Sequence, residues 1–332
     1  MKNIPTVLLI SGGQGCEREV SLAGAEYLRG LIDREKYRLI EVNISPLGGW
    51  FFGDEAVYPI RLGDRRGLWC GGKILRIDCA FPLLHGDYGE DGRIQGALDT
   101  AGIPFVGCDT VSGAVCSDKS YSRAVAESLG VPVAGGIPLP EGLDERELRE
   151  RARELGYPLF FKPKRLGSSV GATPVYNDEQ LYGAYALSCE ISSGGALIEE
   201  LIEEKRELEV GVLYRSGKRI ISPVGEVRCE GFYDYRSKYR DGGSEVTARA
   251  DIDESVERQI IDYTERLTSE LCPGGLCRVD YFLSGERILF NEINTMPGFT
   301  KTSLYPRLMA EAGISPEALC EMLIAEAIGG GI

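Results

Sequence analysis

The sequence is poor in histidine and in closely spaced cysteines. It has one histidine, His85, and no C-x-x-C pair among its 10 cysteines and 332 residues. Zinc sites need clustered cysteine and histidine ligands, and disulfide frameworks belong to small secreted domains, so neither is supported. We interpret most of the cysteines as buried thiols that pack like small apolar side chains. They are Cys16, Cys70, Cys79, Cys108, Cys116, Cys189, Cys229, Cys272, Cys277 and Cys320.

Positive charge is also scarce, because 37 lysines and arginines face 51 acidic residues and give a net charge of −14. A general nucleic-acid binder needs a basic face, so we expect no nucleic-acid partner. An anionic small molecule stays open, since a pocket can be locally basic or can use Mg²⁺ on an acidic protein.

Long hydrophobic runs are missing near the N-terminus, where residues 7–10 form a run of only four apolar side chains. A secretory signal or a membrane span needs a much longer run, so we expect a cytoplasmic protein without a membrane partner. The chain is 43% hydrophobic and 27% charged, which is typical of globular proteins.

Strand and helix patterns alternate in the first third of the chain. We expect strands at residues 7–10, 37–44, 79–84 and 104–107, and helices at residues 20–31 and 94–100. This βαβ order predicts an α/β fold with a doubly wound parallel sheet. Further on we expect a helix at residues 118–129, a charged helix capped by Asp144, and a last helix capped by Ser315. The soft breaks predict domains at residues 1–119, 120–199 and 200–332.

A hairpin near the C-terminus gathers polar side chains on one face. A three-residue loop at 285–287 keeps the other face mostly apolar. The predicted pairs are Asp280 with Glu292, Arg278 with Asn294, and Phe282 with Phe290. Two facing carboxylates repel unless a cation lies between them, and two carboxylates with an amide suit Mg²⁺. The alternative is an exposed hairpin face without a ligand.

Two further stretches suit a nucleotide. Residues 162–171 read K-P-K-R-L-G-S-S-V-G, a loop of glycines and small hydroxyl side chains between predicted strands, with lysines nearby. Such a loop can bind phosphate through backbone N–H groups, although a plain hairpin tip is the alternative. Residues 196–210 run from apolar to acidic and can offer a strand edge to adenine and a carboxylate to ribose. The alternative there is a strand with solvated acids.

Seven motifs stand in order along nearly the whole chain. They are G-G-x-x-x-E-R-E-V-S (12–21), L-H-G-x-x-G-E-D-G-x-x-Q-G (84–96), C-S-D-K (116–119), K-P…G-S-S-V-G (162–171), F-Y-D-Y-x-x-K-Y (232–239), R-V-D (278–280) and N-E-I-N-T-M-P-G-F-T-x-x-S-L-Y-P (291–306). In these motifs the chain resembles the D-alanine–D-alanine ligases of the ATP-grasp superfamily. The resemblance implies an ATP-grasp fold, with an N-terminal doubly wound parallel-sheet domain and two α+β lobes that enclose ATP.

The resemblance also implies an activity. Family members join two D-alanines with ATP, through a D-alanyl phosphate, to supply peptidoglycan precursors. It implies ATP as co-substrate, two Mg²⁺ ions with Mn²⁺ as an alternative, and a homodimer.

Site residues are carried over from the matched motifs. The implied metal ligands are Asp280, Glu292 and Asn294. The implied ATP contacts are Lys119, Lys162, Ser169, Glu199, Glu207, Phe232, Lys238 and Phe282. The implied catalytic residues are Glu19, Ser168, Tyr239, Arg278, Gly298 and Ser303, and the implied substrate contacts are His85 and Leu304. In this set Glu19 binds the ammonium of the first substrate, and Arg278 with the Gly298 amide stabilises the oxyanion.

Three alternatives stay open on the sequence. A D-alanine–D-serine ligase is one, and a D-lactate-specific ligase is disfavoured because such relatives place a histidine near Tyr239. Another ATP-grasp carboxylate–amine ligase is the second. A nucleotide-binding regulatory protein is the third, although such a protein has no need of Arg278.

Overall fold

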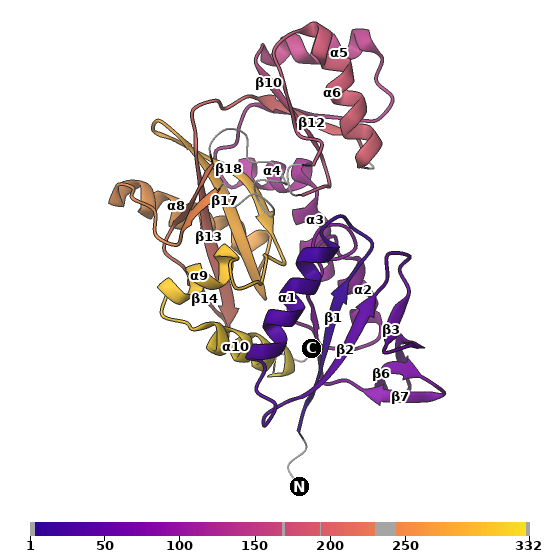
Figure 1. Ribbon diagram of the computed structural model, residues 1–332. Coiled ribbons are helices and arrows are strands. Elements are labelled where there is room, and N and C mark those ends of the chain that lie inside the picture. The colour runs from indigo at the N-terminus through magenta and orange to yellow at the C-terminus, as the bar shows by residue number, and fades with distance from the viewer. Residues whose placement is uncertain (1–3, 168–169, 193, 230–243, 330–332) are drawn as a thin grey trace.

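The computed structural model describes residues 4–167, 170–192, 194–229 and 244–329. Within these ranges the chain forms three large assemblies of sheet and helix. In Figure 1 the first lies at the lower right, the second at the top and the third at the left.

The first sheet is built around a strand that is buried on both faces. In spatial order its strands are β4 (Glu55–Ala56), β3 (Trp50–Phe52), β2 (Arg38–Ile44), β1 (Thr6–Gly12) and β8 (Cys79–Pro82). β1 pairs in parallel with β2 and β8, as the βαβ pattern predicts, and its apolar side chains are buried on both faces as in other parallel sheets. The prediction of a strand at residues 104–107 is wrong. Only an isolated bridge joins Ala80 to Phe105, and the chain turns at Gly107, whose φ is +125°.

Helices from both ends of the chain cover this sheet. α1 (Arg18–Leu31) packs against β1, and α10 (Pro316–Gly329) lies against α1 and β8. Leu9, Leu28, Leu323 and Ile324 belong to one buried apolar cluster. The expected cap of α10 is confirmed, because Ser315 Oγ accepts the Ala318 N–H at 3.2 Å. The remaining elements of this region are β5 (Tyr58–Leu62), β6 (Arg65–Cys70), β7 (Lys73–Arg76) and α2 (Arg93–Thr100).

The second sheet is antiparallel. Its order is β11 (Thr173–Val175), β10 (Leu159–Pro163), β12 (Ala196–Glu200) and β9 (Gly136–Leu139). Two helices, α5 (Glu145–Leu155) and α6 (Asp178–Ile191), pack on it. The predicted cap of α5 is confirmed as a capping box, in which Asp144 Oδ1 accepts the Glu147 N–H at 2.8 Å.

The third sheet carries the polar hairpin. Its order is β16 (Ser244–Thr247), β15 (Gly225–Cys229), β13 (Arg206–Arg215), β17 (Leu276–Ser284) and β18 (Arg287–Asn294), with β14 (Lys218–Ile221) paired to β13. α8 (Glu254–Glu270) packs its apolar side chains into the same core, and α9 (Leu304–Glu311) contacts β13.

The hairpin register is confirmed at its polar end and wrong near its turn. Asp280 lies opposite Glu292, but Phe282 pairs with Leu289 and not with Phe290. The turn holds two residues and not three, since Ser284 pairs with Arg287. A β-bulge between Asp280 and Tyr281 then restores the expected pairing from Asp280 to Arg278. A bulge inserts one extra residue into one strand, here Asn291, which has no residue directly opposite on β17.

Two short helices follow the first sheet in the chain and pack against the third sheet. α3 (Thr110–Ser117) and α4 (Lys119–Ser128) contact β18, and Ala126 shares a core with Val210 and Val279. Asp118 caps α4 by accepting the Ser120 N–H at 2.9 Å, which places Lys119 at the first turn. The domain boundaries at residues 119 and 199 stay a prediction. In the described part of the chain, no helix has both the length and the apolar character that a bilayer crossing requires.

Candidate active site

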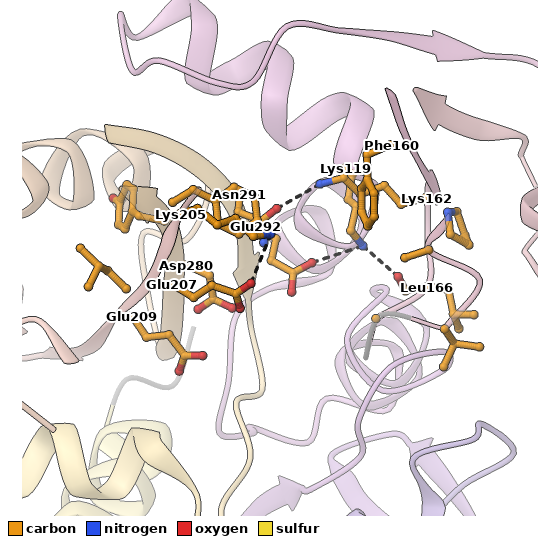
Figure 2. Close-up of a pocket in the computed structure, with 17 residues that line it drawn as sticks. Lys119, Phe160, Lys162, Leu166, Lys205, Glu207, Glu209, Asp280, Asn291 and Glu292 are labelled. Carbon is orange, nitrogen blue, oxygen red and sulfur yellow. Dashed lines mark hydrogen bonds and ion pairs between the residues drawn. The ribbon is translucent and has the colours of Figure 1, made fainter. Parts of the chain in front are cut away.

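A cleft lies between the second and third sheets (Figure 2). Its inner part, beside Asp280 and Glu292, has a cavity volume of about 80 Å³, and its outer part, beside β12 and β15, has about 780 Å³. The two parts share four lining residues, which are Phe160, Lys205, Glu207 and Phe282. Outer volumes of this size are typical of small-molecule sites.

The inner wall is the polar face of the β17–β18 hairpin. Arg278 Nε lies 2.7 Å from Asp280 Oδ1 and 2.8 Å from Glu209 Oε2. Asn294 Nδ2 donates to Asp280 Oδ2 at 3.1 Å. Burial opposes the charge of Arg278, but Asp280 and Glu209 outweigh it and raise the pKa of the guanidinium. Arg278 thus stays charged at the centre of a group of carboxylates.

The sequence reasoning missed Glu209. Its position on β13 carries the signal, because side chains two apart share a face of a strand. Glu207 pairs with Phe282 and Glu209 with Asp280 across β13 and β17, so both acids belong to the face that carries the predicted site.

The side-chain oxygens of the predicted metal ligands suit a Mg²⁺ ion that binds together with a nucleotide. Asp280, Glu292 and Asn294 come from adjacent strands, with Asp280 opposite Glu292. In the ranges that the structure describes, no three histidine, cysteine, aspartate or glutamate side chains are grouped so as to hold a metal alone. Mg²⁺ commonly takes one or two carboxylates and completes its shell with phosphate oxygens and water, which matches this set.

Two predicted lysines, one on α4 and one on β10, face the hairpin. Lys119 Nζ, on α4, lies 3.3 Å from Glu292 Oε2 and donates to the Leu166 carbonyl at 2.8 Å. Lys162 Nζ, on β10, donates to Asn291 Oδ1 at 3.0 Å. The structure therefore brings both lysines to the polar face of the hairpin, where they can balance the charge of a polyphosphate.

Glu199, a predicted ATP contact, lies between two cations. Its Oε2 lies 2.6 Å from Lys162 Nζ, and its Oε1 lies 2.8 Å from Arg123 Nη1. The three side chains are 9 to 10% exposed. Both oxygens are therefore engaged by cations, and Glu199 holds Lys162 in place. Arg123, on α4, was missed because nothing in the sequence links it to Glu199.

Aromatic side chains line the middle of the cleft. Phe282, a predicted adenine contact, and Phe160 of β10 line both parts of the cleft. Phe160 was missed, since the strand around it reads as buried core. The two rings come from different sheets and offer apolar surface where the two parts of the cleft meet.

The predicted acid Glu19 is exposed on the first turn of α1, whereas Glu17, just before α1, is buried with 8% of its surface exposed. A Cβ built at Gly86 would lie 2.6 Å from Glu17 Oε2, and one at Gly167 would lie 3.7 Å from it. Glu17 thus touches both the loop after β8 and the glycine loop after β10. The structure thus places Glu17, and not Glu19, next to Gly167, which lines the inner part of the cleft.

The loop after β8 holds the chain that follows β18. His85 Nδ1 is hydrogen-bonded to the Met296 carbonyl at 2.9 Å, and Glu90 Oε1 accepts the Met296 N–H at 3.0 Å. Burial, and next the charge of Glu17, raise the pKa of Glu90 to about 8. Burial lowers the pKa of His85, whose Nε2 is buried without a hydrogen-bond partner among the described residues. Glu90 was missed, although it lies in a quoted motif.

The remaining predicted residues follow β18. A Cβ built at Gly298 would lie 2.9 Å from Ser303 Oγ, so these two positions are neighbours. Ser303 Oγ also accepts the Thr300 N–H at 3.0 Å. Leu304 is buried with Val227 and Leu308 in a small apolar cluster. Five predicted residues lie outside the described residues, namely Ser168, Ser169, Phe232, Lys238 and Tyr239.

The class of protein follows from this arrangement. Two lobes of sheet and helix hold a cleft with lysines on one side and carboxylates on the other, beside an N-terminal parallel-sheet domain. This is the ATP-grasp fold, as solved relatives also show.

The family can be stated more narrowly than the fold class. A family model described as D-ala D-ala ligase N-terminus matches residues 6–108, and one described as D-ala D-ala ligase C-terminus matches residues 125–325. The chain belongs to the D-alanine–D-alanine ligase family.

Individual relatives match over nearly their full length. A D-alanine–D-alanine ligase of Deinococcus radiodurans is 38% identical, over 97% of this chain and 98% of the relative. One of Mycolicibacterium smegmatis is 35% identical, over 98% and 96%. The solved VanG D-Ala:D-Ser ligase of Enterococcus faecalis superposes with a TM-score of 0.87 at 32% identity, over 97% and 99%. D-alanyl-alanine synthetase A of Vibrio cholerae gives 0.89 at 29%, over 99% and 100%.

Proposed function

We propose that the chain joins two D-alanines into D-alanyl-D-alanine, with ATP as co-substrate and ADP and phosphate as products. The observation that carries the proposal is the register of the β17–β18 hairpin. It sets Asp280 opposite Glu292 and Arg278 opposite Asn294, with Lys119 3.3 Å from Glu292. This arrangement supports the proposal, because the residues that we propose to bind a metal, the oxyanion and phosphate lie close together.

The chemistry has two steps. A carboxylate oxygen of the first D-alanine attacks the γ-phosphorus of ATP, and the bond to the ADP oxygen breaks. The amine of the second D-alanine then attacks the acyl carbon of the D-alanyl phosphate, and phosphate leaves with that carboxylate oxygen while the amine loses a proton. Charge gathers on oxygens in both steps, so positioning and electrostatic stabilisation dominate.

The described residues divide this work. Lys119 and Lys162 balance phosphate charge, and Asp280, Glu292 and Asn294 would hold Mg²⁺, which neutralises phosphate oxygens when bound. Arg278 binds the oxyanion, together with the Gly298 N–H. His85 and Glu90 fix the Met296 peptide two residues before Gly298 and thereby orient that amide.

We assign the ammonium of the first D-alanine to Glu17 in place of Glu19. A buried carboxylate beside the cleft gains more from an ammonium partner than an exposed one does. Glu17 meets that condition, with 8% of its surface exposed, and it lies next to Gly167, which lines the inner part of the cleft.

The nucleoside would lie between the two sheets. Phe282 and Phe160 offer rings for adenine, and Glu207, next to Phe282 across the sheet, offers a carboxylate to the ribose hydroxyls. Glu199 supports Lys162 and leaves the ribose to Glu207.

A second candidate is a D-alanine–D-serine ligase, which is favoured by the similarity to the VanG enzyme at 32% identity. Phosphate release from ATP and Mg²⁺, with mass analysis of the product, separates the candidates. D-alanine alone should support turnover and give D-alanyl-D-alanine. Turnover that appears only when D-serine or D-lactate is added would exclude the first candidate. No turnover with D-alanine, with or without these additions, would exclude both candidates.

The finer expectations belong to the same proposal. On the basis of family membership we propose two Mg²⁺ ions with Mn²⁺ as an alternative, a homodimer, a cytoplasmic location and a role in peptidoglycan precursor supply. Ser168, Ser169, Phe232, Lys238 and Tyr239 keep the roles that the sequence motifs imply. Leu304 is proposed to contact the second substrate through its backbone, because its side chain is buried.

A further inference from the structure

Lys205 lies in the middle of the cleft, directly before β13. Its Nζ is 3.8 Å from the centroid of the Phe282 ring and 3.2 Å from Glu207 Oε1. It lines both the inner and the outer part of the cleft, and Figure 2 shows it beside the hairpin that carries Glu292.

The strand geometry explains this position. Side chains at alternate positions share one face, so Lys205 precedes Glu207 and Glu209 in a row. Across the sheet, Glu207 pairs with Phe282 and Glu209 with Asp280. The row therefore runs from the carboxylates of the inner wall, past the ring, to the ammonium of Lys205.

One ammonium thus contacts both groups that the proposed function assigns to the nucleoside. Adenine needs the exposed face of Phe282, and ribose hydroxyls need an oxygen of Glu207. A purine cannot stack on a ring face that an ammonium covers at 3.8 Å. Lys205 also stands where the inner part of the cleft, about 80 Å³, meets the outer part, about 780 Å³.

We propose that Lys205 occupies the purine-binding face of Phe282 in the nucleotide-free protein and is displaced when adenine stacks there, so that Lys205 sets the affinity for the nucleotide. This inference rests on the proposed ATP site. Displacement is favourable only if the stacking and the ribose contacts exceed the cation–π and ion-pair contacts that are lost. Lys205 therefore lowers nucleoside affinity while it keeps the ring and the carboxylate covered.

The electrostatic surroundings agree with a displaceable ammonium. Burial lowers the pKa of Lys205, and the nearby charge of Lys162 lowers it further, whereas Glu207 raises it. The side chain keeps 21% of its surface exposed, so it has a path to solvent when it leaves the ring.

The test compares three ligands on two variants by calorimetric titration. In Lys205→Met the charge is lost and the apolar length is kept. The dissociation constants for adenosine and for ATP should both fall by roughly two- to fivefold, the range that a cation–π contact of about 0.5–1 kcal/mol gives. Tripolyphosphate, which has no purine, should bind to the variant as it binds to the unchanged protein. Lys218→Met removes the same charge from an exposed position of β14 and should change none of the three constants.

Other results would overturn the inference. Weaker binding of ATP and tripolyphosphate to Lys205→Met, with adenosine unchanged, would make Lys205 a phosphate ligand. No change with any ligand would mean that Lys205 does not compete with the nucleoside. Phe282→Ala tests the site itself, since unchanged adenosine binding there would place the purine elsewhere. The ligase proposal would then still stand or fall on phosphate release with D-alanine.

Discussion

Replacing Arg123 with methionine should destabilise the protein and weaken ATP binding together. Arg123 Nη1 lies 2.8 Å from Glu199 Oε1, and the other oxygen of Glu199 lies 2.6 Å from Lys162 Nζ. The side chains are 9 to 10% exposed, so solvent screens this network little. Methionine keeps the apolar length and removes one of the two cations that balance Glu199.

The expected magnitude follows from burial. Breaking a buried ion pair by removing one partner costs about 3–5 kcal/mol. Lys162 still pairs with Glu199 in the variant, so we expect a loss of about 2–3 kcal/mol in the free energy of unfolding. An unfolding entropy of about 2.1 cal/mol/K per residue makes 1 kcal/mol worth about 1.4 °C in a chain of 332 residues, so the midpoint in a thermal scan should fall by about 3–4 °C. Glu199 would also bind Lys162 more tightly, so the KM for ATP should rise.

Two controls separate this mechanism from a general loss of charge. Glu127 lies 3.4 Å from Arg123 but is 54% exposed, so Glu127→Ala should cost less than about 1 kcal/mol. Glu199→Gln combined with Arg123→Met should cost less than the sum of the single changes, because the carboxylate that lost its partner is gone. Additive losses, or a loss in Glu127→Ala as large as in Arg123→Met, would refute the network as the cause.

Three further predictions concern the substrate side of the cleft. Glu17→Gln should raise the KM for D-alanine about 10- to 100-fold, as a charged hydrogen bond of about 1.5–3 kcal/mol implies, and Glu19→Gln should leave it unchanged; the reverse order in initial-rate assays would restore Glu19. Arg278→Met should lower kcat by about 100- to 1,000-fold, while titration with ATP shows nearly unchanged binding; lost ATP binding would contradict an oxyanion role. The pKa of Glu90 is raised in the folded protein, so its contribution to stability is complete below about pH 4.5 and is lost as pH rises through about 8. Denaturant titrations across this pH range should show that loss in the free energy of unfolding. Glu90→Gln should make the free energy of unfolding depend less steeply on pH; an unchanged dependence would exclude Glu90 as its source.

The polar face of the β17–β18 hairpin was predictable because strand alternation acts over a few residues. Asp280 and Glu292 lie on one hairpin, and the apolar character of the opposite face restricts their register. The same reasoning placed Phe282 opposite Phe290 and was wrong there, because the bulge at Asn291 changes the count between the turn and the polar end. A bulge leaves no clear signal in a single sequence.

The acids near the N-terminus show a different limit. Glu17 and Glu19 lie in the same motif, two residues apart, and neither composition nor spacing separates them. Burial separates them, and it depends on Gly86 and Gly167, which come from other parts of the chain. The sequence likewise predicts Glu199 as an ATP contact but does not point to its partner Arg123, which is 76 residues away in sequence. Contacts of that range depend on the packing of α4 against the sheets.

The packing of α10 against the first sheet has a consequence for biosynthesis. The ribosome makes Leu9 and Leu28 long before Leu323 and Ile324, which share their apolar cluster. The sheet therefore keeps an uncovered apolar face throughout most of translation, a state in which partly folded chains aggregate. A nascent chain that stalls before residue 316 should depend on chaperones to stay unaggregated. Its N-terminal third should become resistant to protease only after α10 has left the ribosome.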